Sequence, residues 1–263
     1  MLHLFKEIMN FIKRFILKRD DINIIENNKE DIEPIVTENK EETIIINKDD
    51  VIMDKYNGTI IILDNGHAKS TPGKRSPLFE DGKTCFFEYE FNRDIVKRVT
   101  KSLNELGITC YNIVPELEED IRLTERAKRT NKIGEKYGFS KCILISVHAN
   151  AAGNGKDWLN ARGWSVYTTK GVTKSDAIAT IFYEEAEKIL PKYGMKLRKD
   201  MSDGDPDWEE NFTVLFASNC PAILTENLFY DNKMDVNFLM SEEGREVIAN
   251  IHINAIKKIC GLE

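Results

Sequence analysis

The sequence predicts an α/β fold: one domain with a twisted, mostly parallel mixed sheet flanked by helices on both faces, preceded by an amphipathic helix and an acidic linker. Short apolar, β-branched runs alternate with longer helical patterns from about residue 55 onward, and this alternation indicates a largely parallel sheet. The 263 residues are 41% hydrophobic and 31% charged, which is typical of a globular protein with a substantial core. The charge pattern changes twice, so we expect segments 1–19, 20–54 and 55–263.

Residues 1–19 form the predicted amphipathic helix and carry a net charge of +4. Apolar side chains recur in this segment at helical spacing. They are Phe5, Ile8, Met9, Ile12, Phe15 and Ile16. Such a helix can contact a membrane surface or a partner, or it can pack on its own domain, and the sequence leaves both open. Charged residues interrupt the run and no small-residue cleavage site follows, so we do not expect a secretory signal.

Residues 20–54 are predicted to be a flexible linker. Residues 20–50 carry a net charge of −8 and show no sustained hydrophobic period. Two short isoleucine runs, at residues 24–25 and 44–46, leave open the alternative of an edge strand.

The first half of the domain alternates strand, helix, strand and helix. An apolar run predicts a buried strand over Thr59–Leu63, and a long loop rich in glycine and proline follows. A helix is expected over residues 88–106, because its apolar positions share one face and Gly107 ends it. A second strand is expected over Ile108–Val114. A second helix is expected over residues 120–137, again followed by a glycine.

The second half continues with four expected strands and two expected helices. Apolar or alternating runs predict the strands Cys142–Val147, Gly163–Thr168, Phe212–Phe216 and Ala222–Thr225. The helices are expected over residues 174–190, ended by Pro191, and over residues 242–260, capped by Ser241. Residues 192–211 are polar and rich in aspartate, which predicts a loop.

Composition excludes several classes of protein. A net charge of −7 argues against a dedicated nucleic-acid binder, because phosphate neutralisation needs a basic surface. No apolar run is long enough to predict a transmembrane helix. The five cysteines include no C-x-x-C pair, which predicts reduced thiols and synthesis in a reducing compartment.

Two of the four histidines follow predicted strands. His67 comes just after the first strand, in LDNGH, and His148 directly follows the third, in SVHAN. Ligands of open α/β sheets bind beyond the carboxyl ends of strands, so these two side chains can meet across a site. Either histidine alone is more simply a hydrogen-bonded loop or core residue. His3 and His252 are assigned no role.

Two glutamates stand out against their apolar surroundings. Glu88 shares the apolar face of its predicted helix, where it can answer the helix dipole or bind a cation. Glu226 ends a buried strand, where it can bind loop amides or carry out chemistry. Two histidines, one carboxylate ligand and a nearby glutamate base are the composition of a catalytic zinc site.

These residues lie in motifs that resemble the zinc-dependent N-acetylmuramoyl-L-alanine amidases of the amidase-3 type. The motifs are DNGH at 64–67, EYEFN at 88–92, SVHAN at 146–150 and TENLF at 225–229. The segment LTERAKRTN at 123–131 is also similar to a helix of that family. The resemblance covers residues 58–260. Departures from the family pattern, at Asn65 and at Ala68–Lys69, fall on positions that donate no metal ligand.

The resemblance implies that His67, Glu88 and His148 bind Zn²⁺ and that Glu226 is the catalytic base. It implies hydrolysis of the amide between N-acetylmuramic acid and L-alanine in peptidoglycan. A zinc-activated water would attack, and Glu226 would move its proton. Asp64 and Asn150 are candidate supports that orient the ligands, or simply turn residues at strand ends.

Three alternatives remain open at the level of sequence. A zinc peptidase could act on peptidoglycan stem peptides, with Arg75 or Arg162 holding a free carboxylate. A non-catalytic wall-binding module would not need Glu226. An interaction protein would act through residues 1–19. Three tryptophans near the predicted site, Trp158, Trp164 and Trp208, are expected mainly to pack, although contact with sugar or peptide is an alternative.

The expected setting is a bacterial cell wall. The reduced cysteines and the missing signal predict synthesis in the cytoplasm without a cleavable signal peptide, followed by action on the wall from the periplasm or from a virion. A phage or prophage endolysin fits this route. A host enzyme that remodels the wall is the alternative.

Overall fold

A computed structural model describes residues 23–24, 35–39, 42–46 and 56–262 of the chain. The chain separates into two units, Met1–Lys55 and Tyr56–Glu263. The predicted amphipathic helix over residues 1–19 lies outside the described residues. Among the described residues, no helix combines the length and the apolarity that crossing a membrane requires.

The described part of the first unit is a small antiparallel sheet. Its strands are β1 (Asn23–Ile24), β2 (Ile35–Asn39) and β3 (Glu42–Ile46), in the order β1-β2-β3. Thr37 of β2 pairs with Ile44 of β3. β3 contains the second isoleucine run, and its β-branched residues favour extended backbone. Strands thus occupy part of the segment that was expected to be a flexible linker.

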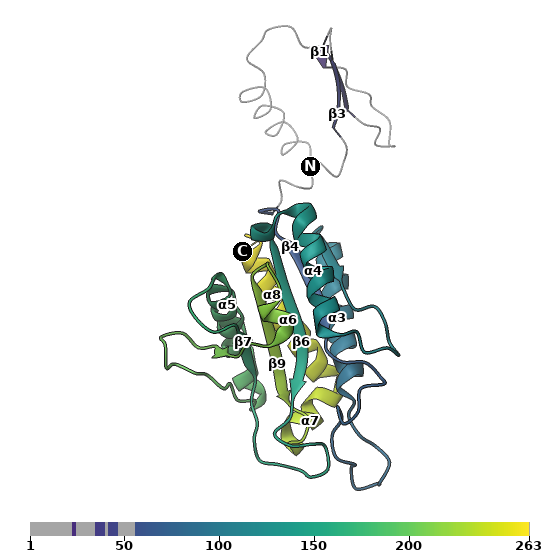
Figure 1. The fold of residues 1–263 in the computed structure, drawn as a ribbon, viewed down its shortest axis with the longest axis vertical. Coiled ribbons are helices and arrows are strands. Elements are labelled where there is room, and N and C mark those ends of the chain that lie inside the picture. The colour runs from purple at the N-terminus through teal and green to yellow at the C-terminus, as the bar shows by residue number, and fades with distance from the viewer. Residues whose placement is uncertain (1–22, 25–34, 40–41, 47–55, 263) are drawn as a thin grey trace. The chain divides into compact units, whose positions relative to one another are not determined.

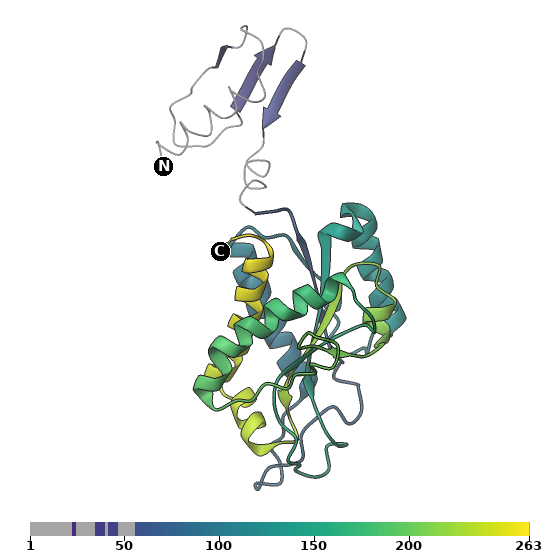
Figure 2. The same cartoon turned by 90° about the vertical axis from the view of Figure 1, so that its left-hand side faces the viewer.

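The second unit is built on a six-stranded mixed sheet (Figures 1 and 2). Its strands lie in the order β5-β4-β6-β9-β7-β8. They are β4 (Ile60–Asn65), β5 (Cys110–Asn112), β6 (Cys142–Asn150), β7 (Ser165–Thr168), β8 (Trp208–Glu209) and β9 (Ala222–Phe229). β5, β4, β6 and β9 are parallel to one another, whereas β7 runs antiparallel to β9 and β8 is parallel to β7. The prediction of a mostly parallel mixed sheet is confirmed.

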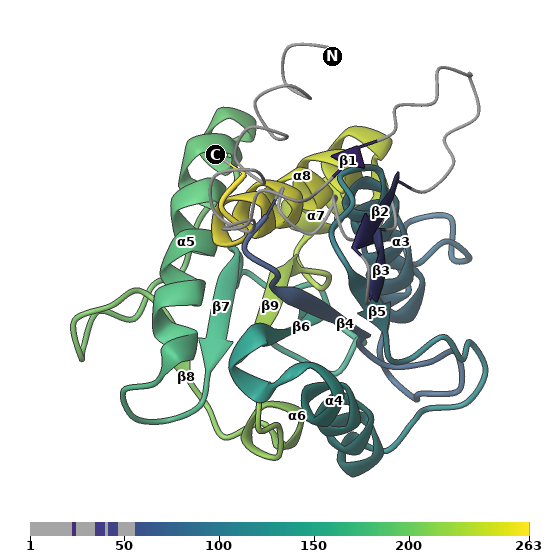
Figure 3. The same cartoon turned by 90° about the horizontal axis from the view of Figure 1, so that it is seen from above.

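Helices flank the sheet (Figure 3). The helices are α3 (Glu88–Glu105), α4 (Leu123–Tyr137), α5 (Lys174–Ile189), α6 (Thr213–Phe216), α7 (Lys233–Met240) and α8 (Glu242–Ile259). Short 3-10 turns follow α4 and α5, at Phe139–Lys141 and Leu190–Tyr193. The last long helix begins as predicted, because the Ser241 hydroxyl accepts a hydrogen bond from the Gly244 amide.

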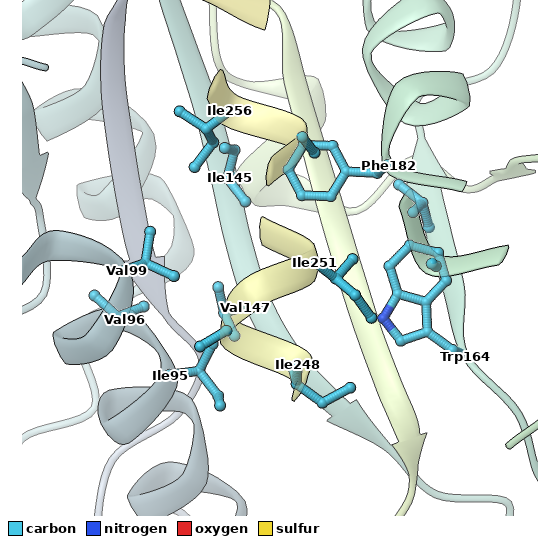
Figure 4. Close-up of a cluster of buried hydrophobic side chains, with 14 of the residues drawn as sticks. Ile95, Val96, Val99, Ile145, Val147, Trp164, Phe182, Ile248, Ile251 and Ile256 are labelled. Atoms are coloured by element: carbon cyan, nitrogen blue, oxygen red, sulfur yellow. The ribbon is translucent and has the colours of Figure 1, made fainter. Parts of the chain in front are cut away.

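The alternation of side chains along β4 shows how the layers form. Ile61 and Leu63 pack into a cluster with side chains of α3, α5 and α8. Ile60 and Ile62 point the other way and join a second cluster, which includes side chains of α4 and α6. Figure 4 shows the first cluster, in which α3, β6, α5 and α8 all contribute aliphatic or aromatic groups. Each such fully buried side chain stabilises the fold by about 1.5–3 kcal/mol.

The structure differs from the sequence prediction mainly between residues 192 and 240. The strand predicted over Phe212–Phe216 was wrong, because these residues form α6, a single helical turn from Thr213. An apolar run of five residues fits both a strand and a helical turn, so its periodicity cannot separate them. The short strand β8 lies in the predicted loop, and α7 was not predicted. β9 continues to Phe229, which places Glu226 inside the strand rather than after it.

Candidate active site

The parallel strands bring the predicted site residues to one edge of the sheet. β6 lies between β4 and β9, and the register places His148 of β6 directly beside Glu226 of β9. His67 follows the end of β4 by two residues. Glu88 is the first residue of α3. Residues far apart in sequence therefore meet where neighbouring strands end, as expected for an open α/β sheet.

The turn after β4 holds His67 in a left-handed backbone conformation, with φ of 60°. Non-glycine residues seldom adopt this conformation, although histidine tolerates it better than most. Two side chains of α3 fix the turn. The Asn92 amide donates to the Gly66 carbonyl at 3.0 Å, and the Arg93 guanidinium donates to the His67 carbonyl at 2.9 Å.

His67, Glu88 and His148 converge around one point. Glu88 Oε1 lies 3.0 Å from His148 Nδ1, and Glu88 Oε2 lies 3.5 Å from His67 Nε2. The two imidazole rings meet edge to face with centroids 4.9 Å apart. One ligand atom from each residue lies within 4.8 Å of the others. The Glu88 side chain is 1% exposed, and the histidines are 19% and 14% exposed, so the cluster is buried but reachable from solvent.

The pKa values of the cluster follow from burial and from these contacts. Burial lowers the pKa of His67 to about 4, so its imidazole is neutral at pH 7. Burial is the largest influence on His148 and lowers its pKa, but the hydrogen bond to Glu88 and the negative charges of Glu88, Glu226 and Asp64 together outweigh burial, and the pKa rises. Burial opposes ionisation of Glu88, yet the His148 hydrogen bond and the two imidazoles lower the pKa of that carboxyl.

Glu226 supplies a second carboxylate at the same edge. Its Oε2 is buried and has no hydrogen-bond partner among the described residues. Burial raises the pKa of Glu226 to about 7, and the negative Glu88 adds to this rise, while His148 and Lys74 oppose it. A carboxyl group with a pKa near neutrality can both accept and return a proton.

The donor set fits a divalent transition metal. Glu88 Oε2 is buried without a hydrogen-bond partner among the described residues, which a bound cation would correct. Two imidazoles and one carboxylate are the protein ligands of many catalytic zinc sites, which keep a further position for water. The neutral form of His67 is also the form that binds metal.

The segment that carries these residues matches a known protein family. The family of N-acetylmuramoyl-L-alanine amidases called Amidase_3 matches residues 61–258, which include all four residues of the site. The chain belongs to this family. The amidase is thus a hydrolase of peptidoglycan that cleaves the bond between N-acetylmuramic acid and L-alanine, and the predicted family and activity are confirmed.

Two curated relatives support this assignment. The amidase is 26% identical over 208 residues to the endolysin of Bacillus phage SPP1, covering 78% of this chain and 67% of the relative. It is 29% identical over 203 residues to the N-acetylmuramoyl-L-alanine amidase CwlM of Bacillus licheniformis, covering 77% of this chain and 69% of the relative.

Solved structures share the fold of the amidase. One is an N-acetylmuramoyl-L-alanine amidase of Clostridium difficile 630, with a TM-score of 0.61 and 22% identity, covering 77% of this chain and 96% of that one. Another is the catalytic domain of CwlV from Bacillus (Paenibacillus) polymyxa var. colistinus, with a TM-score of 0.60 and 18% identity, covering 78% and 99%.

Gly66 is a site residue that the sequence analysis did not single out. A Cβ atom at this position would lie 2.3–2.6 Å from three atoms of the His148 ring. The Gly66 amide also donates to the Val147 carbonyl at 3.0 Å, which locks the two strand ends together. The position of Gly66, directly before His67, is the signal that could have drawn attention to it.

The two candidate ligand supports contact other groups. The buried Asp64 carboxylate accepts from Arg126 at 2.7 Å and from the Ser146 hydroxyl at 2.6 Å, and does not touch a ligand side chain. The Asn150 amide oxygen accepts from the Ala151 amide at 2.8 Å, as a turn residue does at a strand end. These hydrogen bonds of Asp64 and Asn150 are thus to groups at the strand ends and not to the imidazoles of His67 and His148.

The three tryptophans have different environments. Trp164 is fully buried and donates from its indole to the Asn227 side chain at 2.8 Å. Trp158 packs edge to face on Phe79. Trp208 is half-buried, with the Arg198 guanidinium 4.8 Å from its ring centroid.

The arginines considered as carboxylate clamps are committed elsewhere in the amidase. Arg162 pairs with the buried Asp235 at 3.1 Å, and Arg75 donates to the Ser76 carbonyl at 2.9 Å. His252 is buried in α8, with Nδ1 donating to the Ile248 carbonyl and Nε2 accepting from Thr225.

Proposed function

We propose that the amidase works with Zn²⁺ held by His67, Glu88 and His148, and with Glu226 as the general base. The observation that carries this proposal is the place of Glu226. Glu226 lies on the strand beside His148, and its Oε2 is buried and unpaired among the described residues. A group in that position can reach a water molecule at the metal site.

Each side chain then has a defined task. When bound, zinc supplies Lewis acidity, which lowers the pKa of a water molecule and polarises the substrate carbonyl. Glu226 accepts the proton of the attacking water and returns it to the nitrogen of the leaving L-alanine. Glu88 holds His148 by hydrogen bonding to its Nδ1, which fixes the orientation of that ring.

We propose an indirect positioning role for Asp64. Its carboxylate binds Arg126, and the same guanidinium donates to the Asn65 carbonyl at 2.7 Å, two residues before His67. The pair thereby holds the backbone that leads into the ligand turn. We propose a similar supporting role for Asn150, whose side-chain oxygen accepts a hydrogen bond from the Ala151 amide in the turn after β6.

Digestion of purified sacculi tests the chemistry. Wild-type protein is compared with a chelator-treated sample, with Glu226→Gln, and with the control Glu105→Gln at the exposed end of α3. Mass spectrometry should find free stem peptides that begin with L-alanine in the wild type and in the control. Loss of the base should slow release by roughly 10²–10⁴-fold.

Two results would contradict these roles. Full activity of Glu226→Gln would remove Glu226 from the mechanism. Shortened peptides that stay attached to muramic acid would indicate a stem-peptide peptidase. Zinc content measured for each variant separates loss of the base from loss of the metal, because Glu226→Gln should keep its zinc.

We also propose that the protein is made in the bacterial cytoplasm and reaches the wall from inside the cell, as an endolysin does. All five cysteines are unpaired, which suits a reducing compartment. The likeness to a phage endolysin supports the same route. Cells that produce the protein should lyse only after their inner membrane is permeabilised, and lysis without that step would count against this setting.

A further inference from the structure

Arg198 lies beside the catalytic edge of the sheet. The segment around Leu197 forms a β-bridge with Trp164, the residue before β7. The Trp164 amide donates to the Lys196 carbonyl and the Arg198 amide donates to the Trp164 carbonyl, both at 2.8 Å. Ser165, the first residue of β7, pairs with Glu226 of β9. Arg198 is therefore about two strand spacings, roughly 10 Å, from Glu226 along the sheet.

The fold surrounds the Arg198 side chain on several sides. Its guanidinium lies 4.8 Å from the ring centroid of Trp208 and 5.1 Å from that of Phe229. A Cβ atom on Gly163 would approach the Arg198 side chain to 2.9 Å, so only glycine leaves room for its stem. The Arg198 charge also acts on the Tyr167 hydroxyl and opposes the rise in pKa that burial causes there. These contacts hold a half-buried cation in one place.

Arg198 lacks the carboxylate partner that comparable arginines have. Arg126 and Arg162 pair with Asp64 and Asp235, at 2.7 and 3.1 Å. Within residues 56–262, no carboxylate lies within 4.0 Å of the Arg198 guanidinium. A guanidinium offers five N–H donors in a planar fork that matches a carboxylate.

Resting on the proposed function, we propose that Arg198 is a specificity-determining residue that binds the free carboxylate on the second residue of the stem peptide. The scissile amide must lie at Glu226 and the metal ligands. The leaving L-alanine and the residue after it extend by about 3.3–3.6 Å each. A peptide that leaves the site toward β7 would therefore bring a carboxylate on its second residue within reach of the Arg198 side chain.

The size of the effect follows from the contact. A charge-assisted hydrogen bond to a carboxylate contributes more than a neutral one, and its loss corresponds to roughly 10- to 100-fold in kcat/KM. Amidation of the same carboxylate removes its charge and half of its acceptor oxygens. The enzyme should therefore prefer the acid form of the stem peptide over the amide form.

A competition experiment tests this directly. The full-length zinc enzyme digests an equal mixture of two uncross-linked glycan preparations that differ only at the second stem residue, isoglutamate in one and isoglutamine in the other. Mass spectrometry of the released peptides gives the ratio of the two kcat/KM values. The variants are Arg198→Gln, Arg198→Lys and the control Lys199→Gln, whose ammonium pairs with Glu187 instead.

We expect wild type and Lys199→Gln to release the acid peptide at least 10-fold faster than the amide peptide. Arg198→Gln should lose this preference, with unchanged zinc content, because it slows cleavage of the acid substrate more than cleavage of the amide substrate. Both rates can change, because the Arg198 charge also lowers the pKa of Glu226. Arg198→Lys should keep part of the preference, because it retains the charge without the planar fork.

The failures are distinguishable. A wild type that cleaves both substrates equally overturns the inference and leaves the proposed function standing. An Arg198→Gln variant that slows equally on both substrates overturns it as well, since that result describes a structural role. Release of L-alanine peptides from neither substrate overturns the proposed function and the inference together.

Discussion

At the scale of the residue, the site depends on close packing as much as on chemistry. The His148 ring is held on one side by its hydrogen bond to Glu88 and on the other by the bare backbone of Gly66. The proposed ligand His148 can keep this position only if residue 66 has no side chain. Burial also affects two carboxyl groups away from the site. One oxygen of Asp205 and one of Asp207 are buried without a hydrogen-bond partner among the described residues.

We predict that Gly66→Ala weakens zinc binding by roughly 10- to 100-fold, the usual cost of disturbing a ligand's support. The added methyl group would push the His148 ring away from Glu88. Zinc affinity is measured by competition with a chromogenic chelator. Gly171→Ala is the control for an added methyl group, because its Cβ would meet open space. Its φ of 90° adds a backbone cost that Gly66 does not have, so the control is the more severe change for the backbone. Unchanged affinity of Gly66→Ala would show that the ring can move without harm.

We predict that Asp207 makes the protein less stable as pH rises from about 4 to about 7. Burial raises the pKa of Asp207 to about 7, and Asp205 adds to the rise. Between the ordinary value of 3.8 and about 7, the folded state therefore keeps a proton that the unfolded chain releases, and raising the pH favours unfolding. The limiting slope for one group is about 1.4 kcal/mol per pH unit.

Urea unfolding of wild type and Asp207→Asn over this pH range measures the effect. The neutral variant should become more stable relative to wild type as pH rises, while the Thr168 hydroxyl keeps an acceptor for the bond it now gives to Asp207. A stability difference that stays constant across the range would contradict the prediction.

At the scale of the element, buried polar contacts tie the sheet edge to its helices. Arg126 of α4 is 1% exposed and binds Asp64, Asp120 and two backbone carbonyls. Asn227 of β9 donates to the His148 carbonyl at 2.8 Å and accepts from the indole of Trp164. Such contacts fix how β4, β6 and β9 end relative to one another, which a hydrophobic core alone would leave loose.

We predict that Arg126→Met lowers the free energy of unfolding by about 3–5 kcal/mol, because it leaves the buried Asp64 carboxylate without its counter-charge. The matched control is Arg129→Met, on the same helix. Arg129 pairs with the half-exposed Glu116, so this loss should be about 0–1 kcal/mol. Denaturant unfolding measures both. Equal losses of unfolding free energy in the two variants would show that the buried pair of Arg126 and Asp64 stabilises the fold no more than the exposed pair does.

At the scale of the whole molecule, the catalytic machinery belongs to one of the two units. Both hydrophobic clusters and all four site residues lie within residues 56–262. The first residues of this unit contact its last helix and its core. Tyr56 is buried in the core, and the Asn57 amide donates to the Cys260 carbonyl at 3.1 Å. Folding and catalysis are therefore expected to need only this unit.

We predict that a chain of residues 56–263 folds cooperatively and releases L-alanine peptides from purified sacculi within about 3-fold of the full-length rate, because a single core of this size is self-sufficient. Circular dichroism and the sacculus assay provide the measurements, with Glu226→Gln in the shortened chain as the inactive control. An unfolded or inactive product would show that residues 1–55 contribute to the catalytic unit.

Much of this architecture was predictable from local patterns. The strand β4 and the helix α3 came within two residues of their predicted bounds, because apolar period and glycine stops are properties of neighbouring residues. His67, His148 and Glu226 were predicted as candidates because each follows an apolar run, and Glu88 because it shares the apolar face of its helix. The roles of all four were implied by the resemblance to the family's motifs. The turn α6 was missed because a short apolar run has no decisive period.

Local sequence patterns predicted the alternation of strands and helices, the four candidate residues of the site and the family. The contacts between side chains became visible only in the folded domain. It set Glu226 beside His148, placed Gly66 against the His148 ring, and brought Arg198 to the edge of β7. These contacts depend on the strand order β4-β6-β9-β7, in which neighbours in space come from distant parts of the chain. Periodicity reports what a residue faces within its own element, whereas strand order is settled by the packing of the entire domain.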